Sequence, residues 1–166
     1  MIRYDIDIEA GDWSDLAGDR AIRRALDAVE AAGSLPSGLA GPATPSATPF
    51  DLSILLTDDG RMRELNHRWR GVDRPTNVLS FPAEDRTPDA PPRLAMLGDV
   101  VVAHETLHRE AREGGIRPVD HFTHLIIHGV LHLFGHDHLN DADAERMEAI
   151  ETQALATLGI ADPYAQ

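Results

Sequence analysis

The sequence contains no cysteine and no lysine among its 166 residues. Without cysteine the chain forms neither disulfides nor thiolate metal sites, which agrees with a cytosolic location. No apolar run reaches the length of a membrane span, and the N-terminus does not show the basic and then apolar pattern of a signal peptide. These absences favour a cytoplasmic protein with no membrane partner. The length predicts a single domain over residues 1–166.

Positive charge is scarce. The chain has fifteen arginines and 28 acidic residues, so its net charge is −13, which argues against a nucleic-acid partner. The arginines are unevenly placed, however, and seven of them fall between residues 61 and 93. If the substrate is an anion, we expect this segment to hold it together with a metal ion. The alternative is that arginine simply replaces lysine throughout the chain.

Hydrophobic periodicity predicts an α+β fold. Alternating or continuous apolar residues predict strands at 2–8, 50–57, 77–81 and 97–103. Helical spacing predicts helices at about 14–32, 58–67, 104–113, 118–134 and 140–158. The polar segment 66–77 is predicted as a loop, and the Gly- and Pro-rich residues 33–49 as a flexible surface connection. We expect one small mixed sheet of about four strands with about five helices packed on it.

Six of the nine histidines lie between residues 121 and 138. His128 and His132 are four residues apart, so on a helix they share one face and can bind one metal ion. Gly135 then lets the chain leave the helix and turn back. His138 is therefore predicted as the third ligand, with His136 as the alternative. We expect this metal-site helix to pack against the sheet.

Three imidazoles with an open fourth position are typical of a catalytic zinc site. One Zn²⁺ per chain is predicted, although Ni²⁺, Co²⁺ or Cu²⁺ would also accept these ligands. Neutral histidines leave the 2+ charge of the ion uncompensated, whereas a carboxylate ligand would cancel part of it. The site therefore favours an anionic substrate such as a phosphodiester.

The histidine spacing also matches the zinc-peptidase motif H-E-x-x-H-x-x-G-x-x-H, except that Gly129 replaces the glutamate. That glutamate is the general base of those peptidases, and glycine cannot take a proton from water. A metallopeptidase is therefore disfavoured. His121 and His124 lie on the same stripe and are predicted to be hydrogen-bonded residues of a partly buried face.

Three stretches in order resemble the bacterial YbeY family of rRNA maturation endoribonucleases. They are the histidine run at 121–138, the segment from Leu65 to Pro82, which includes Arg-Gly-Val-Asp-Arg-Pro-Thr-Asn-Val-Leu-Ser-Phe, and Leu-Gly-Asp-Val-Val at 97–101. The closing acidic helix also fits, and the resemblance covers about residues 50–158.

The resemblance implies a single-strand-specific, metal-dependent endoribonuclease in 16S rRNA 3′-end maturation and ribosome quality control. It implies an α+β fold, a zinc site at His128, His132 and His138, and a functional arginine at Arg70. It also implies that the partners are the 16S rRNA precursor and the small ribosomal subunit, in the cytoplasm.

Given the functional arginine that the resemblance implies, Arg70 is the candidate for contact to the phosphate, where its guanidinium can stabilise negative charge. The alternative is a loop arginine paired with Asp73. Arg68 and Arg74 are candidates for contacts to the RNA backbone, and Trp69 is predicted to pack rather than to stack on a base.

Two questions stay open in the sequence. The nucleophile is either water or the 2′-hydroxyl of the RNA. The competing non-catalytic hypothesis is a ribosome assembly factor in which zinc has only a structural role.

Overall fold

The fold is built on a four-stranded mixed sheet. The computed structural model describes residues 1–33, 49–88 and 94–165. The strands are β1 (Ile2–Ile8), β2 (Phe50–Thr57), β3 (Val78–Pro82) and β4 (Met96–Ala103). In the order β1-β2-β4-β3, β2 pairs in parallel with β1 and β4, and β3 lies antiparallel to β4 at the edge. The predicted four-stranded mixed sheet is confirmed.

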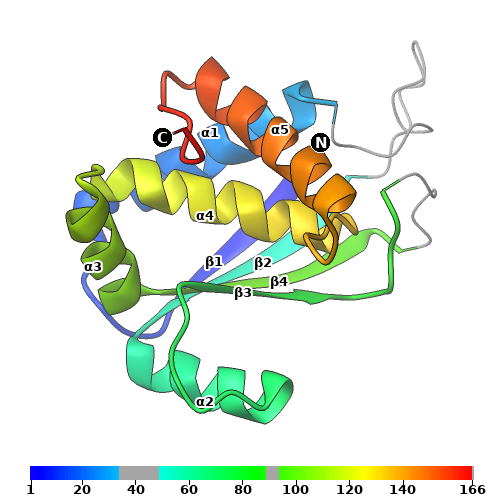
Figure 1. Cartoon of the computed structure of the whole chain (residues 1–166). Helices are drawn as coiled ribbons and strands as arrows, with labels where there is room; N and C mark the ends of the chain where they lie inside the picture. The colour runs from blue at the N-terminus through cyan, green and yellow to red at the C-terminus, as the bar shows by residue number, and fades with distance from the viewer. Residues whose placement is uncertain (34–48, 89–93, 166) are drawn as a thin grey trace.

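Helices cover both faces of this sheet (Figure 1). They are α1 (Gly18–Ala31), α2 (Asp59–Arg70), α3 (His104–Gly114), α4 (Pro118–Leu133) and α5 (Asp141–Thr157). Helices α1, α4 and α5 lie on one face, and α2 lies on the other. The five helices and the α+β class are as predicted. In the part of the chain that the structure describes, no helix has the length and apolar character to cross a membrane.

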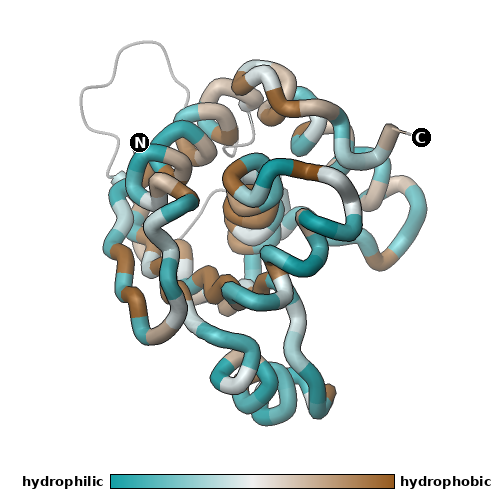
Figure 2. The backbone as a smooth tube through the Cα atoms, turned by 90° about the vertical axis from the view of Figure 1, so that its left-hand side faces the viewer, coloured by the Kyte–Doolittle hydropathy of each residue, from teal (hydrophilic) through white to brown (hydrophobic). Residues whose placement is uncertain are grey.

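Helix α4 is the centre of the core and contacts β3, β4, α1 and α5. Figure 2, which looks nearly along this helix, shows apolar residues concentrated on it. From His121 to Leu133 every residue is buried except the four histidines of the row His121, His124, His128 and His132. Each large apolar side chain buried here contributes about 1.5–3 kcal/mol. The fold therefore leaves open only the row that carries the predicted ligands.

Helix α2 is longer than predicted. The predicted end was His67, whereas the helix continues to Arg70. Gly71 ends it by adopting the left-handed conformation, with φ of +72°. Residues 68–70 are therefore helical, and the prediction of a loop there is wrong. The glycine that marks the true end was visible in the sequence.

The first predicted helix is also divided. A short 3-10 turn, Ser14–Leu16, is separated from α1 by Ala17, whose φ is +47°. The predicted continuous helix from residue 14 is therefore wrong at its start. The predicted flexible connection at 33–49 falls almost entirely on residues 34–48, which lie outside the described residues.

Helix α4 lies very close to the sheet at Gly129. A Cβ at this position would lie 3.0 Å from Cγ1 of Val100 and 3.2 Å from Oγ of Ser80. The Ser80 hydroxyl also donates a 2.8 Å hydrogen bond to the Gly129 carbonyl oxygen. Val100 is fully buried and branched at Cβ, so it has little freedom to move aside. Close packing therefore requires glycine here.

Gly129→Ala is expected to lower the free energy of unfolding by about 1–3 kcal/mol, because the added methyl group overpacks the helix-to-sheet contact. The measurement is urea-induced unfolding. Gly60→Ala is the matched control, since a Cβ at that position of α2 meets only Asp58 Oδ1, at 3.5 Å. The control should be neutral or stabilising by up to about 1 kcal/mol. Equal effects of the two substitutions would contradict the close-packing explanation.

Candidate metal centre

His128 and His132 lie on the last turns of α4. Since they are four residues apart, their rings meet, and their Nε2 atoms are 3.0 Å apart. Two neutral imidazoles that point their ring nitrogens at each other need a proton or a metal ion between them. The pair therefore fits one half of a metal site.

Gly135 lets the chain turn back so that His138 joins this pair. Its φ is +91°, and a Cβ would lie only 2.3 Å from the Arg86 carbonyl oxygen, so both backbone conformation and close contact require glycine. The His138 ring centroid is 5.8 Å from that of His128 and 5.1 Å from that of His132. Ligand atoms of the three histidines all lie within 4.8 Å of one another. One divalent ion fits among them.

His136, the alternative third ligand, is buried and lines the same cleft, but it does not belong to this group of three. The geometry therefore favours His138. Among the described residues, no fourth His, Asp or Glu joins the group. A metal held by these three side chains would keep a coordination position for substrate or solvent.

The electrostatics of the group also suit a metal ion. Burial, together with the nearby His128 and His138, lowers the pKa of His132 to about 4. His132 is therefore neutral at pH 7. A neutral imidazole offers its lone pair to a metal without first losing a proton.

Glu151 on α5 is a buried carboxylate at the back of this group, and the sequence reasoning missed it. Its side chain is fully buried. Its Oε1 lies 2.8 Å from Nδ1 of His128, and its Oε2 lies 2.7 Å from Nε2 of His124. His128 thus turns one ring nitrogen to Glu151 and the other to His132. In this arrangement a carboxylate fixes the orientation of a metal-ligating histidine.

A tyrosine from the C-terminal segment completes the environment of Glu151. The Tyr164 hydroxyl donates a hydrogen bond to Oε2 of Glu151. Burial alone would raise the pKa of Glu151, but the hydrogen bonds from His124, His128 and Tyr164 lower it to about 2. Burial and the adjacent carboxylate raise the pKa of Tyr164, which stays a neutral donor. Glu151 is therefore ionised at neutral pH, facing the imidazoles.

His121, one turn earlier on α4, binds a different acid. Its Nε2 lies 2.7 Å from Oε2 of Glu110, which also accepts a 2.9 Å hydrogen bond from the Asn77 amide. Since His124 is bonded to Glu151, the prediction that these two histidines are hydrogen-bonded residues of a partly buried face is confirmed.

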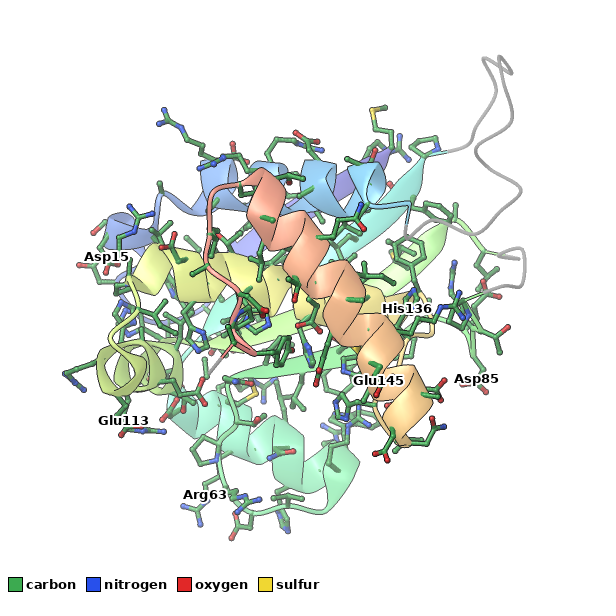
Figure 3. All side chains as sticks on the ribbon, turned by 45° about the horizontal axis from the view of Figure 1, so that its top comes forward. Asp15, Arg63, Asp85, Glu113, His136 and Glu145 are labelled. Carbon is green, nitrogen blue, oxygen red and sulfur yellow. The ribbon has the colours of Figure 1, made fainter. Side chains whose placement is uncertain are left out.

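A cleft of about 770 Å³ opens over the three histidines. Its walls include β3 and Arg70, the last residue of α2. Arg70 donates a 3.0 Å hydrogen bond to the carbonyl oxygen of Ser80, on the edge strand. Figure 3 shows two further lining residues, Asp85 and His136, at this same end of the molecule. Helices on opposite faces of the sheet thus both supply residues to one cleft.

The other predicted arginines lie outside this cleft. Arg68 and Arg74 are exposed and are not among its lining residues. Asp73, the predicted alternative partner of Arg70, instead accepts 2.8 Å and 3.0 Å hydrogen bonds from Arg63. The hypothesis that Arg70 is simply the ion-pair partner of Asp73 is wrong.

Gly129 explains structurally why the peptidase base is absent. Its Cα faces Val100 and Ser80 of the sheet, and it does not line the cleft. A glutamate here would be driven into the sheet rather than toward the histidines. The backbone of this helix therefore has no room for the catalytic glutamate of the zinc-peptidase motif.

A family model described as Endoribonuclease YbeY matches residues 21–159. The chain belongs to the YbeY family. An Endoribonuclease YbeY from Rhizobium meliloti is 49% identical over 165 residues, covering 96% of this chain and 92% of the relative. Another, from Sinorhizobium medicae, is 58% identical over 120 residues, covering 72% of this chain and 70% of the relative.

The family model and these relatives confirm the family resemblance inferred from the histidine run and the two upstream segments. The solution structure of TM1509 from Thermotoga maritima aligns over the whole of both chains, with a TM-score of 0.56 and 22% sequence identity. This likeness supports the α+β fold.

Glu151→Gln is expected to weaken metal binding about 10- to 100-fold, because the charge that orients His128 is removed while the side-chain size is kept. The measurement is a competitive metal titration of the folded protein. Glu145→Gln, at an exposed position of the same helix (Figure 3), should bind metal like the unaltered chain. If both variants bind metal equally well, Glu151 does not orient a ligand.

Proposed function

We propose that this chain is a metal-dependent endoribonuclease that cleaves single-stranded RNA during ribosomal RNA maturation. The supporting observation is that three histidines and Arg70 line one open cleft. The relatives whose name is Endoribonuclease YbeY supply the substrate class. A cleft that pairs a cationic metal site with a guanidinium suits a phosphodiester.

His128, His132 and His138 are the proposed metal ligands, and Glu151 orients His128 from behind. We propose Zn²⁺, one per chain, because an all-nitrogen set of three neutral ligands suits it. When bound, such an ion acts as a Lewis acid toward the phosphate. Glu151 orients the ring of His128, and the turn at Gly135 brings His138 beside the other two.

Arg70 is the proposed catalytic arginine. One of its five N–H groups is engaged by the Ser80 carbonyl, which fixes the guanidinium at the edge of the cleft. The remaining donors are available to two phosphate oxygens at once. Charge that develops on those oxygens in the transition state is stabilised by this preorganised donor pair.

The nucleophile is either water or the 2′-hydroxyl of the RNA, and neither route uses a side chain at position 129. A peptidase mechanism would require a base there, whereas RNA carries its own hydroxyl next to the scissile phosphate. The absence of room at Gly129 therefore supports RNA over peptide as substrate.

The charge of the chain supports a ribosomal partner. A net charge of −13 disfavours tight binding of free RNA. We propose that the small ribosomal subunit, in the cytoplasm, positions the RNA over the cleft. Arg68 and Arg74 remain proposed contacts to the RNA backbone outside the cleft.

Arg70→Ala is expected to reduce cleavage of single-stranded RNA about 100- to 1000-fold, the usual loss when one preorganised donor to developing charge is removed. His132→Ala and a chelator should each reduce cleavage to background, and casein should not be cleaved. The measurement is the initial rate on a labelled oligonucleotide. Arg63→Ala is the control, because Arg63 is paired with Asp73 and lies outside the cleft.

Two results would reject these assignments. Cleavage that resists both the chelator and His132→Ala would come from another site or a contaminant. Full activity of Arg70→Ala would remove its catalytic role while leaving the metal site intact.

Elemental analysis of the purified protein is expected to find about one zinc per chain, the stoichiometry of a single tetrahedral site. His132→Ala should lose it. His108→Ala should retain it, because His108 lies on α3 and binds Asp15 instead. A different metal at the same stoichiometry would reject zinc, and zinc retained by His132→Ala would reject this site.

A further inference from the structure

The chain has two tryptophans in opposite environments. Trp13 is buried, with 5% of its surface exposed, and packs on Phe122. Trp69 is 60% exposed at the end of α2. The prediction that Trp69 packs holds only for its contact with Phe81, because most of the residue is exposed. Trp69 therefore presents to solvent a large ring with an apolar body and a polar N–H, the kind of side chain that is enriched at interfaces.

Trp69 is linked to the cleft by a row of ring contacts. The Arg70 guanidinium carbon lies 5.9 Å from the centroid of the Phe81 ring. The Phe81 ring lies edge-on to Trp69, with centroids 6.2 Å apart. The Arg68 guanidinium carbon lies 5.2 Å from the Trp69 ring. The row Arg70, Phe81, Trp69, Arg68 thus runs outward from the proposed phosphate contact, with two adjacent aromatic rings between two guanidinium groups.

The arginines of this row form no ion pair with a described residue, so their charges are available to bind an anion. Arg61 pairs with Glu64 and Glu9, and Arg63 pairs with Asp73. Arg68, by contrast, forms no ion pair with any residue that the structure describes, and its guanidinium lies over the Trp69 ring. In a chain of net charge −13, an unpaired arginine beside an exposed aromatic ring is a local exception.

We propose that the row from Arg70 to Arg68 is a subsite for single-stranded RNA next to the scissile phosphate, in which a base stacks on Trp69 and Arg68 binds the backbone. The proposal rests on the proposed function, and adds to it where the strand runs when it leaves the cleft. Stacking on an aromatic ring requires an unpaired base, so this subsite would also select single strands over duplex RNA.

A protein partner fits this surface less well than RNA does. Aromatic rings between two guanidinium groups offer a face for stacked bases and charges for the phosphates on either side, the combination that binds single-stranded nucleic acid. Continuity with Arg70 also places the surface beside the reacting phosphate. Contact with a ribosomal protein instead is one outcome of the experiment below.

The experiment compares Trp69→Ala, Trp69→Phe and the control Arg63→Ala in the metal-loaded full chain. The substrates are a single strand of about ten nucleotides, within the usual length of such sites, and a dinucleotide that reaches only the cleft. Trp69→Ala should raise KM for the longer strand about 5- to 150-fold with kcat nearly unchanged. Trp69→Phe should recover part of this loss, and the dinucleotide should not distinguish the variants.

Two further measurements use the same proteins. Arg68→Ala should reduce the slope of log affinity against log salt by about 0.7, the contribution of one phosphate contact on a single strand. In the unaltered chain, treated with chelator to prevent cleavage, the strand should quench tryptophan emission. Trp69→Phe should abolish that quenching, because the remaining Trp13 is buried.

The outcomes separate this proposal from the proposed function. RNA cleavage by the unaltered chain, with KM and emission indifferent to Trp69, would overturn the subsite and leave the nuclease standing. A defect of Trp69→Ala seen only on ribosomal particles would assign the surface to a protein and also overturn the subsite. Quenching by RNA without any cleavage would support the subsite and reject the nuclease.

Discussion

Ser80 joins the two halves of the site, and the rest of the arrangement depends on it. Its hydroxyl binds the Gly129 carbonyl of α4, and its own carbonyl binds Arg70 of α2. One residue on an edge strand thus fixes the helix with the histidines from one face of the sheet and the arginine from the other. Because both hydrogen bonds involve one residue of a short strand, they hold the imidazoles and the guanidinium at a fixed spacing. Such preorganisation lets a site stabilise charge without rearranging first.

The sequence predicts a site residue when its role depends on residues nearby in the chain, and fails when the role depends on a distant contact. His128 and His132 could be identified from the sequence because the helical period places them on one face, and Gly135 indicated the turn that follows. Glu151 could not be singled out among 28 acidic residues, although its spacing from the buried Met147 and Ala154 places it on the inner face of α5. Its role depends on how α5 packs across α4, and this tertiary contact cannot be read from the sequence. Among fifteen arginines, only the family resemblance distinguished Arg70.

The fold was predictable in its elements and less so in their ends. The four strands were visible because buried strands give clear apolar runs, and the mixed class followed from their irregular alternation with helices. The end of α2 was misplaced because polar residues such as Arg68 resemble a loop in composition. The error matters for Trp69. Because Trp69 belongs to a helix, the direction of its side chain and its neighbours are set by the helical spacing. The ring contacts around it follow from this extension of α2.

The contact between Gly135 and the Arg86 carbonyl also links the metal centre to the order of folding events. His138 reaches its place only when the turn at Gly135 rests on the segment before β4, which is far away in the sequence. The first two histidines are brought together by a helix that needs only local bonds, whereas the third waits for a distant contact of high loop-closure entropy. A newly made chain would therefore present a two-histidine half-site before the complete one. Full ligation would then mark that the long-range fold has closed.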